Sequence, residues 1–201
     1  TNGGRTVTVQ TLEEELYPQY YHKGNGSTDA EEPAPEAALA AQADAQVELK
    51  EKHLVFKENQ RGVSYDALFG PYLRGATRIE VTDPYLRKFH QVRNFMELLE
   101  TIARQKSEGE EVAVHLVTIQ DEFSEHQVEW FQRIREACLT VGIRFTMAFD
   151  PIGKLHARHI VTDHGWKISL DRGLEIFQPY EMNDAFDFTN RLQRQIGRAS
   201  C

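Results

Sequence analysis

The sequence is poor in cysteine and contains no long apolar runs. Cys138 and Cys201 are its only cysteines, which excludes a disulfide framework and a CxxC zinc site and favours a reducing, cytoplasmic environment. No apolar stretch reaches the length of a membrane span, and no signal-peptide pattern stands at the start. Contact with a membrane is therefore expected to be peripheral.

Excess positive charge is also absent. The formal net charge is −8, and residues 1–52 hold ten acids against four bases, which leaves −2 for residues 53–201. A basic domain is the usual mark of a nucleic-acid binder, and the overall charge gives no such mark. Any phosphate-bearing partner has to be bound by a local cluster of cations.

Three regions differ in composition. Residues 1–21 begin with strand-like alternation and then turn acidic and aromatic; because Thr1 is not a methionine, we expect a remnant of an upstream domain. Residues 22–62 are rich in Ala, Pro, Gly and acids, as in a linker. Apolar periodicity starts at Val63, so residues 63–198 are predicted to form the folded domain.

Helical and strand-like periods alternate within that domain. Such alternation implies right-handed crossovers and an α/β fold, with a mixed, mainly parallel sheet flanked by helices and a C-terminal β-hairpin. Helices are predicted over residues 64–73, 89–106, 124–142 and 183–196, and strands over 77–83, 111–119, 142–150, 155–163 and 166–170.

One predicted helix carries the cysteine at position 138. Ser124 is its expected N-cap, and an apolar face is formed by Val128, Phe131, Ile134 and Cys138. This spacing indicates a core cysteine rather than a nucleophile.

The predicted hairpin holds a histidine, an arginine and an aspartate in the pattern HxRxxxxD. On a strand, His156 and Arg158 share one face, and Asp163 follows at the turn. The string resembles the HxKxxxxD motif of the phospholipase D superfamily, with arginine replacing lysine. In that chemistry a histidine attacks phosphorus, a cation holds the non-bridging oxygens and an acid orders the site.

Catalysis of this kind needs two copies of the motif, because a second histidine must protonate the leaving group. None of the other seven histidines is followed by Lys or Arg two positions later. A single chain therefore cannot supply the complete site. The alternative is an ordinary surface hairpin in which Arg158 pairs with Asp163, since a motif this short arises by chance in roughly 2% of such chains.

A wider resemblance accompanies the motif. The resemblance rests on the segments "VSYDALFGPYL", "IEVTDPYLR" and "HARHIVTDHGWKISLDRGLEIF". Together they make residues 63–198 similar to the C-terminal phospholipase D-like domain of MIT-domain-containing proteins. The resemblance implies one degenerate motif, no hydrolysis of phosphodiesters, peripheral membrane binding and homodimers.

Two features depart from that family. Residues 1–62 lack the helical periodicity of an MIT domain, which such proteins use to bind ESCRT-III tails. Asp163 keeps the acid of the enzyme motif where the family often has another residue. Arg158, by contrast, is a fixed bidentate clamp that suits holding a phosphate.

Several cations could form one phosphate-binding pocket with Arg158. They are Lys154, Lys167 and Arg172 on the hairpin and Arg87 after the first strand of the domain. The alternative is a set of solvated strand ends paired with nearby acids.

Other polar and aromatic residues have less specific patterns. Trp166 fits either the core or a lipid interface, and His159 with His164 lacks a third metal ligand. No metal and no cofactor are expected.

The leading hypothesis is a non-catalytic module that binds phosphate groups on an anionic phospholipid surface or on a protein partner. The rival is a dimeric phosphodiesterase or nuclease in which each chain contributes His156, Arg158 and Asp163. Nucleic acid is a partner only under that rival.

Overall fold

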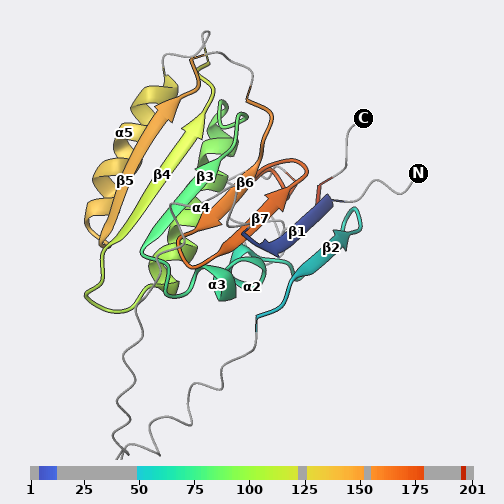
Figure 1. The fold of residues 1–201 in the computed structure, drawn as a ribbon. Helices are drawn as coiled ribbons and strands as arrows, with labels where there is room; N and C mark the ends of the chain where they lie inside the picture. The colour runs from blue at the N-terminus through green and yellow to red at the C-terminus, as the bar shows by residue number, and fades with distance from the viewer. Residues whose placement is uncertain (1–4, 13–48, 122–125, 152–154, 179–195, 198–201) are drawn as a thin grey trace, which may run out of the picture.

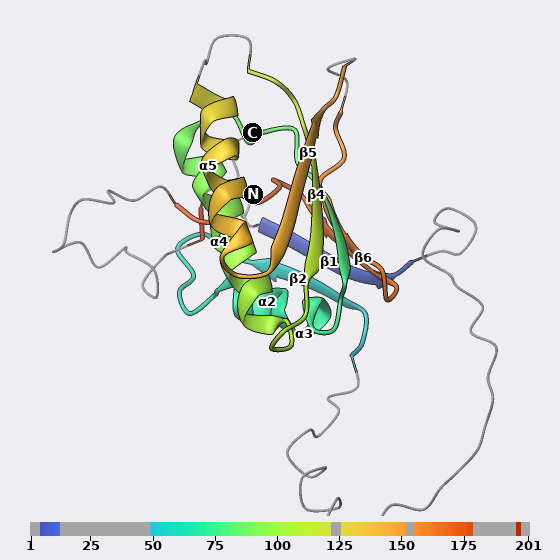
Figure 2. The same cartoon turned by 90° about the vertical axis from the view of Figure 1, so that its left-hand side faces the viewer.

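A computed structural model describes residues 5–12, 49–121, 126–151, 155–178 and 196–197. Its strands form a seven-stranded sheet in the order β2-β1-β7-β6-β3-β4-β5 (Figure 1). The described helices all lie on one face of this sheet, as the edge-on view in Figure 2 shows. In chain order the elements are β1 Arg5–Thr11, β2 Lys52–Phe56, α2 Tyr65–Leu68, α3 Gly70–Leu73, β3 Arg78–Thr82, α4 Phe89–Gln105, β4 Val112–Thr118, α5 His126–Leu139, β5 Ile143–Phe149, β6 His159–Thr162 and β7 Trp166–Leu170.

The parallel part of the sheet is β3-β4-β5, with α4 and α5 as crossovers. Each strand alternates buried and less buried residues, and Val114 and Leu116 of β4 are fully buried. Side chains two apart on a strand share a face, so this alternation directs one face toward the helices. The predicted α/β class is confirmed.

The C-terminal hairpin is also confirmed. β6 and β7 pair antiparallel, and β6 pairs antiparallel with β3. Gly165 occupies the turn at φ +95°, a conformation that side chains with a β-carbon rarely adopt. The hairpin therefore extends the sheet beside β3.

The two outer strands on the other side of the hairpin correct the expected domain plan. Arg5–Thr11, assigned above to an upstream remnant, forms β1 between β2 and β7. Lys52–Phe56, assigned to the linker, forms β2 at the edge. The alternation in β1 buries Val7 and Val9 to 1% exposure each, which explains why it pairs with distant strands.

Adding β1 and β2 to the sheet makes most of its strand pairings antiparallel. Two pairings, β3 with β4 and β4 with β5, are parallel. The pairings of β1 with β2 and β7, of β6 with β7, and of β3 with β6 are antiparallel. The sheet is mixed as expected, but it is not mainly parallel.

The core lies between the sheet and α4 and α5. Phe95, Phe131 and Phe145 form a contiguous aromatic group, and Cys138 is buried as predicted. Burial also raises the pKa of the Cys138 thiol to about 11, which suppresses the reactive thiolate.

The predicted face of α5 is wrong at its first position. Val128 is 49% exposed, whereas the neighbouring Gln127 is completely buried. The Gln127 amide donates to the carbonyls of Leu86 and Ile119, and its oxygen accepts from the Asp121 backbone N–H. These bonds pair backbone carbonyl and N–H groups in the neighbouring loops. An apolar side chain at position 127 would leave those groups unpaired.

Some expectations lie outside the described residues. These are the N-cap at Ser124, the position of Lys154, and residues 183–195 of the predicted last helix. Ile196, the final residue of that prediction, instead forms an isolated antiparallel bridge with Phe177 and is fully buried.

Candidate anion-binding site

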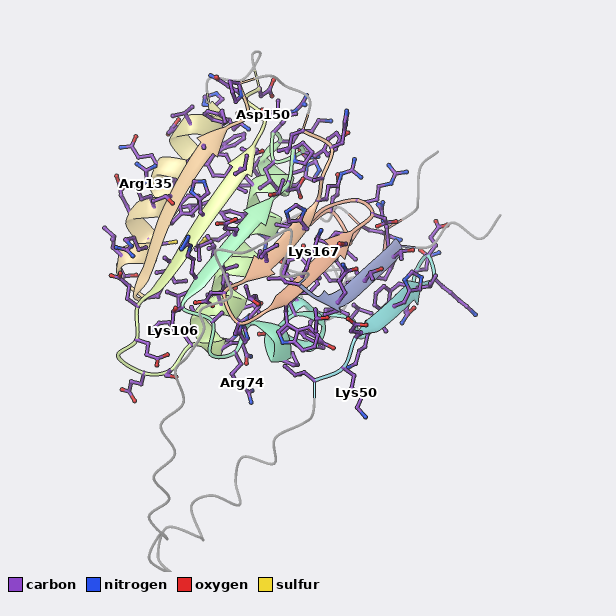
Figure 3. The ribbon with its side chains drawn as sticks, in the orientation of Figure 1. Lys50, Arg74, Lys106, Arg135, Asp150 and Lys167 are labelled. Atoms are coloured by element: carbon purple, nitrogen blue, oxygen red, sulfur yellow. The ribbon has the colours of Figure 1, made fainter. Side chains whose placement is uncertain are left out.

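One edge of the sheet collects most of the predicted site. β3 and β5 end there, β6 begins there, and β7 ends there, because β6 runs antiparallel to both of its neighbours. Figure 3 labels Asp150, just after β5, at the top of this edge. Ligands of α/β proteins commonly bind outside the carboxyl ends of parallel strands.

A buried carboxylate joins two segments at this edge. Asp83, 2% exposed, accepts hydrogen bonds from the backbone N–H of Tyr85 at 3.0 Å and of Leu174 at 2.8 Å. Burial raises the pKa of Asp83 to about 6, against the opposing influence of those two N–H groups and of the Arg158 charge. The turn over residues 171–175 is thus tied to the loop that follows β3.

Two arginines meet the same aromatic ring. The guanidinium carbon of Arg158 lies 4.5 Å from the centroid of the Tyr85 ring, and that of Arg87 lies 5.9 Å from it. Cation–π contacts of this kind contribute about 0.5–2 kcal/mol each. Arg158 also donates from Nη1 to the Asp171 carbonyl, so its guanidinium is fixed from two sides.

Both arginines keep donors that the described residues do not use. The Nε atoms of Arg87 and Arg158 are buried and have no hydrogen-bond partner among the residues that the structure describes. A buried donor without a partner costs about 1–3 kcal/mol. Because Arg87 and Arg158 as whole residues are only partly buried, their fixed guanidinium groups suit an anion that arrives from outside.

A second set of side-chain bonds holds the loop and the turn together. Gln91 accepts from the backbone N–H groups of Arg87 and Lys88 and donates to the Glu175 carboxylate at 3.1 Å. His90 Nε2 lies 3.2 Å from the same carboxylate. Arg87 therefore sits on a loop anchored to the turn that carries Arg172.

His156 lies near the same edge, but it does not lie on a strand as predicted. β6 begins at His159, so His156 and Arg158 lie before the strand and do not alternate along it. The Leu155 N–H donates to Asp150 at 3.0 Å, which fixes the approach to the strand. His156 itself is exposed and forms no hydrogen bond or ion pair with another described residue.

Asp163 lies at the opposite end of β6. Its carboxylate accepts from the backbone N–H of Thr77 and from that of Arg78, and from the Thr77 hydroxyl at 2.5 Å. At about 3.3 Å per residue, it is roughly 16 Å along the chain from Arg158. The structure does not pair Arg158 with Asp163, so the alternative of an Arg158–Asp163 brace is wrong.

Of the remaining predicted cations, only some lie at this edge of the sheet. Arg172 lies in the turn beside Gly173, at the site edge. Lys167 lies within β7, opposite Val161 and Gln10, and Figure 3 shows it in the middle of the sheet. Lys154 is outside the described residues. Arg87 and Arg158 thus share the Tyr85 ring and Arg172 lies in the adjoining turn, whereas Lys167 is not at this edge.

Sequence reasoning missed two contributors, Asp83 and Arg5. Asp83 follows a predicted strand and precedes a proline. That pattern indicated the end of the strand and gave Asp83 no role in the site. Arg5 begins the alternating string RTVTVQT, and it is 7% exposed at the start of β1. The alternation was the available signal for Arg5, but no partner strand was visible nearby in the sequence.

The other candidates fit the core or the surface. Trp166 packs on Tyr72 with ring centroids 5.0 Å apart, which supports its core interpretation. Burial and the Lys167 charge lower the pKa of His159. Within the described part of the chain, no group of three His, Cys, Asp or Glu side chains is arranged to hold a metal, and none of its helices is long and apolar enough to cross a membrane.

The mixed sheet flanked by helices and its hairpin are those of a phospholipase D-like domain, as the family comparison shows. Residues 62–199 match the family described as the phospholipase D-like domain at the C-terminus of MIT, and the chain belongs to this family. It is similar to mouse MIT domain-containing protein 1, with 28% identity over 130 residues. The match covers 63% of this chain and 51% of the mouse protein, so the chain spans about half the length of that relative.

Proposed function

We propose that this domain is a non-catalytic module that binds phosphate groups of anionic lipids or of a protein partner. The observation that carries the proposal is the pair Arg87 and Arg158, fixed around Tyr85 with buried, unused Nε donors. Arg172 adds a third cation from the adjoining turn. An arginine–phosphate hydrogen bond contributes about 1.5–3 kcal/mol.

The non-catalytic part of the proposal follows from the histidines. Nucleophile and acid both have to be present, and His156 is the one histidine in an HxR pattern. Asp163 is used at the far end of β6, where it binds backbone N–H groups. Arg158, fixed by Asp171 and Tyr85, supports holding a phosphate better than transferring a proton.

A cytoplasmic location with peripheral membrane contact and a homodimeric state complete the proposal. Anionic vesicles present phosphates at high local density, and because the net charge is −8, attachment has to rely on a local group of cations such as Arg87, Arg158 and Arg172. Rising salt should therefore weaken attachment, because exposed charges are screened within about 10 Å at 0.1 M salt.

The test is co-sedimentation with phosphatidylserine or phosphoinositide vesicles at low salt, for wild type, Arg87→Met and Arg135→Met. Arg135 is exposed on α5 and far from the edge in Figure 3, so it is a control of equal charge change. Arg87→Met should reduce binding about tenfold, and Arg135→Met less than twofold. Equal losses would show that only net charge matters, and no binding by wild type would favour a protein partner.

The rival function is a dimeric phosphodiesterase with His156 as nucleophile in one chain and acid in the other. Its support is that His156 is exposed and stands two residues before Arg158 in the chain. Purified protein should be assayed on DNA, RNA and phosphatidylcholine beside His156→Ala. We expect no turnover by either protein; turnover that disappears with the substitution would establish the rival.

A further inference from the structure

Arg5 lies on the helix-covered face of the sheet, at the edge that carries Arg158. Arg5, Val7 and Val9 alternate toward the core, and Val7 is paired with Leu170 of β7. Leu170 in turn donates to the Arg158 carbonyl at 3.0 Å. Val7 therefore lies about two strand spacings from Arg158, and Arg5, two residues further along β1, lies roughly 12 Å from Arg158 across the sheet.

The Arg5 guanidinium is buried and is not fully paired by the described residues. Arg5 is 7% exposed, and its Nε and Nη1 have no hydrogen-bond partner in the described part of the chain. Its Nη2 lies so close to Gly197 that a β-carbon on that residue would come within 3.1 Å. Burial of a charged group without full pairing is expensive, so this arrangement calls for an anion.

The charged groups around Arg5 come from the turn after β7. Burial lowers the pKa of Arg5, as does the Arg172 charge, while Asp171 and Glu175 raise it. Asp171 lies between the buried Arg5 and the half-buried Arg158: its backbone N–H donates to the Thr6 carbonyl at 3.3 Å, and its carbonyl accepts from Arg158. Continuing the pairing of β1 with β7 by two residues from Val7 and Leu170 places Arg172 opposite Arg5. The cations thus group as Arg87 with Arg158, around Tyr85, and Arg5 with Arg172.

We propose that this edge binds a ligand carrying two phosphate groups, one on each arginine pair. The proposal rests on the phosphate-binding function above and specifies its ligand. A single phosphate engages one pair and leaves the donors of the other unused, whereas a bisphosphorylated inositol offers oxygens to both. The same chemistry is present in a soluble inositol bisphosphate and in a doubly phosphorylated phosphoinositide head group.

The first arm of the test is calorimetric titration of the full chain at low salt with inositol monophosphate and inositol bisphosphate. Bisphosphate should bind at least tenfold more tightly than monophosphate. Arg5→Met should reduce that preference to less than threefold, and Arg135→Met should leave it unchanged. The second arm repeats the measurement with vesicles containing singly or doubly phosphorylated phosphoinositide, and the arm that shows the preference identifies the source of the phosphates.

Thermal unfolding separates a binding role of Arg5 from a structural one. An apolar replacement of a buried, incompletely paired charge is often neutral or stabilising, so ligand-free Arg5→Met should melt at or above the wild-type temperature. The increase in melting temperature that bisphosphate gives should be lost. If Arg5→Met does not fold, Arg172→Met, from the same pair, provides the same test of preference.

Three results bear against the proposal. Equal affinity for monophosphate and bisphosphate overturns the two-site ligand and leaves the phosphate-binding function intact. Absence of binding to any phosphate compound or vesicle contradicts that function itself. A lower melting temperature in Arg5→Met with an unchanged preference shows that Arg5 is structural, and the proposal is then wrong.

Discussion

Gly173 packs directly against the buried carboxylate of Asp83. A β-carbon on residue 173 would overlap the Asp83 oxygens, and Gly173 has φ +62°. The following residue, Leu174, donates its N–H to the same carboxylate. The turn that carries Asp171 and Arg172 can therefore approach the end of β3 because position 173 has no side chain.

The first prediction concerns this contact. Gly173→Ala combines left-handed backbone strain with the overlap, and we expect a loss of about 3 kcal/mol in the free energy of unfolding. Gly165→Ala is the matched control, because Gly165 has φ +95° and open space around it; about 1 kcal/mol is expected there. Urea unfolding measures both, and equal losses would show that the contact with Asp83 is not tight.

The second prediction is a pH dependence from Asp83. Its pKa is about 6 in the folded protein and 3.8 ordinarily, so folding takes up a proton between these values. The resulting stabilisation is complete below pH 4 and is lost as the pH rises through 6; it amounts to at most about 3 kcal/mol. Asp83→Asn does not titrate and should lack this slope.

The difference in the free energy of unfolding between wild type and Asp83→Asn isolates the contribution of the Asp83 carboxyl, because His90, Glu175 and Arg158 are present in both proteins. Unfolding by urea between pH 4 and pH 7 should show the wild type losing stability relative to the variant as the pH rises. Parallel curves would mean that Asp83 keeps its ordinary pKa.

The third prediction concerns β1. Val9 is 1% exposed and lies opposite Ile168 of β7, so Val9→Ala should reduce the free energy of unfolding by about 2 kcal/mol. Thr8→Ala changes the neighbouring residue on the other face, where its hydroxyl meets His53, and should cost less than 0.5 kcal/mol. If Val9→Ala is equally mild, the N-terminal strand is not part of the stable core.

The fourth prediction separates Asp163 from the phosphate site. Asp163→Ala leaves the N–H groups of Thr77 and Arg78 without their carboxylate and should cost about 1–2 kcal/mol of stability. Vesicle binding of the folded variant should stay within twofold of wild type. Glu108→Ala, an exposed change of the same charge, is the control, and a tenfold change in binding specific to Asp163→Ala would contradict this assignment.

Local periodicity was sufficient for the central elements. The apolar spacing in Phe89–Gln105 predicted α4, the apolar run in residues 111–119 predicted β4 as a buried strand, and the turn at Asp163-His164-Gly165 between two alternating runs predicted the hairpin. These signals work because side-chain direction along one helix or strand repeats within a few residues. The positions of the basic residues on the hairpin and after the first strand also predicted one site with Arg158, Arg172 and Arg87, together with Lys154 and Lys167.

Tertiary structure alone decided how distant segments combine. The strand in Arg5–Thr11 looked isolated because its partner β7 follows after more than 150 residues, and no local pattern encodes that pairing. Asp83 and Leu174 meet across 91 residues. The length of β6 placed Asp163 at the far end from Arg158. Sequence by itself therefore determined which side chains carry charge and which central elements form, whereas long-range pairing and burial decided which charges share an edge and which donors lack a partner among the described residues.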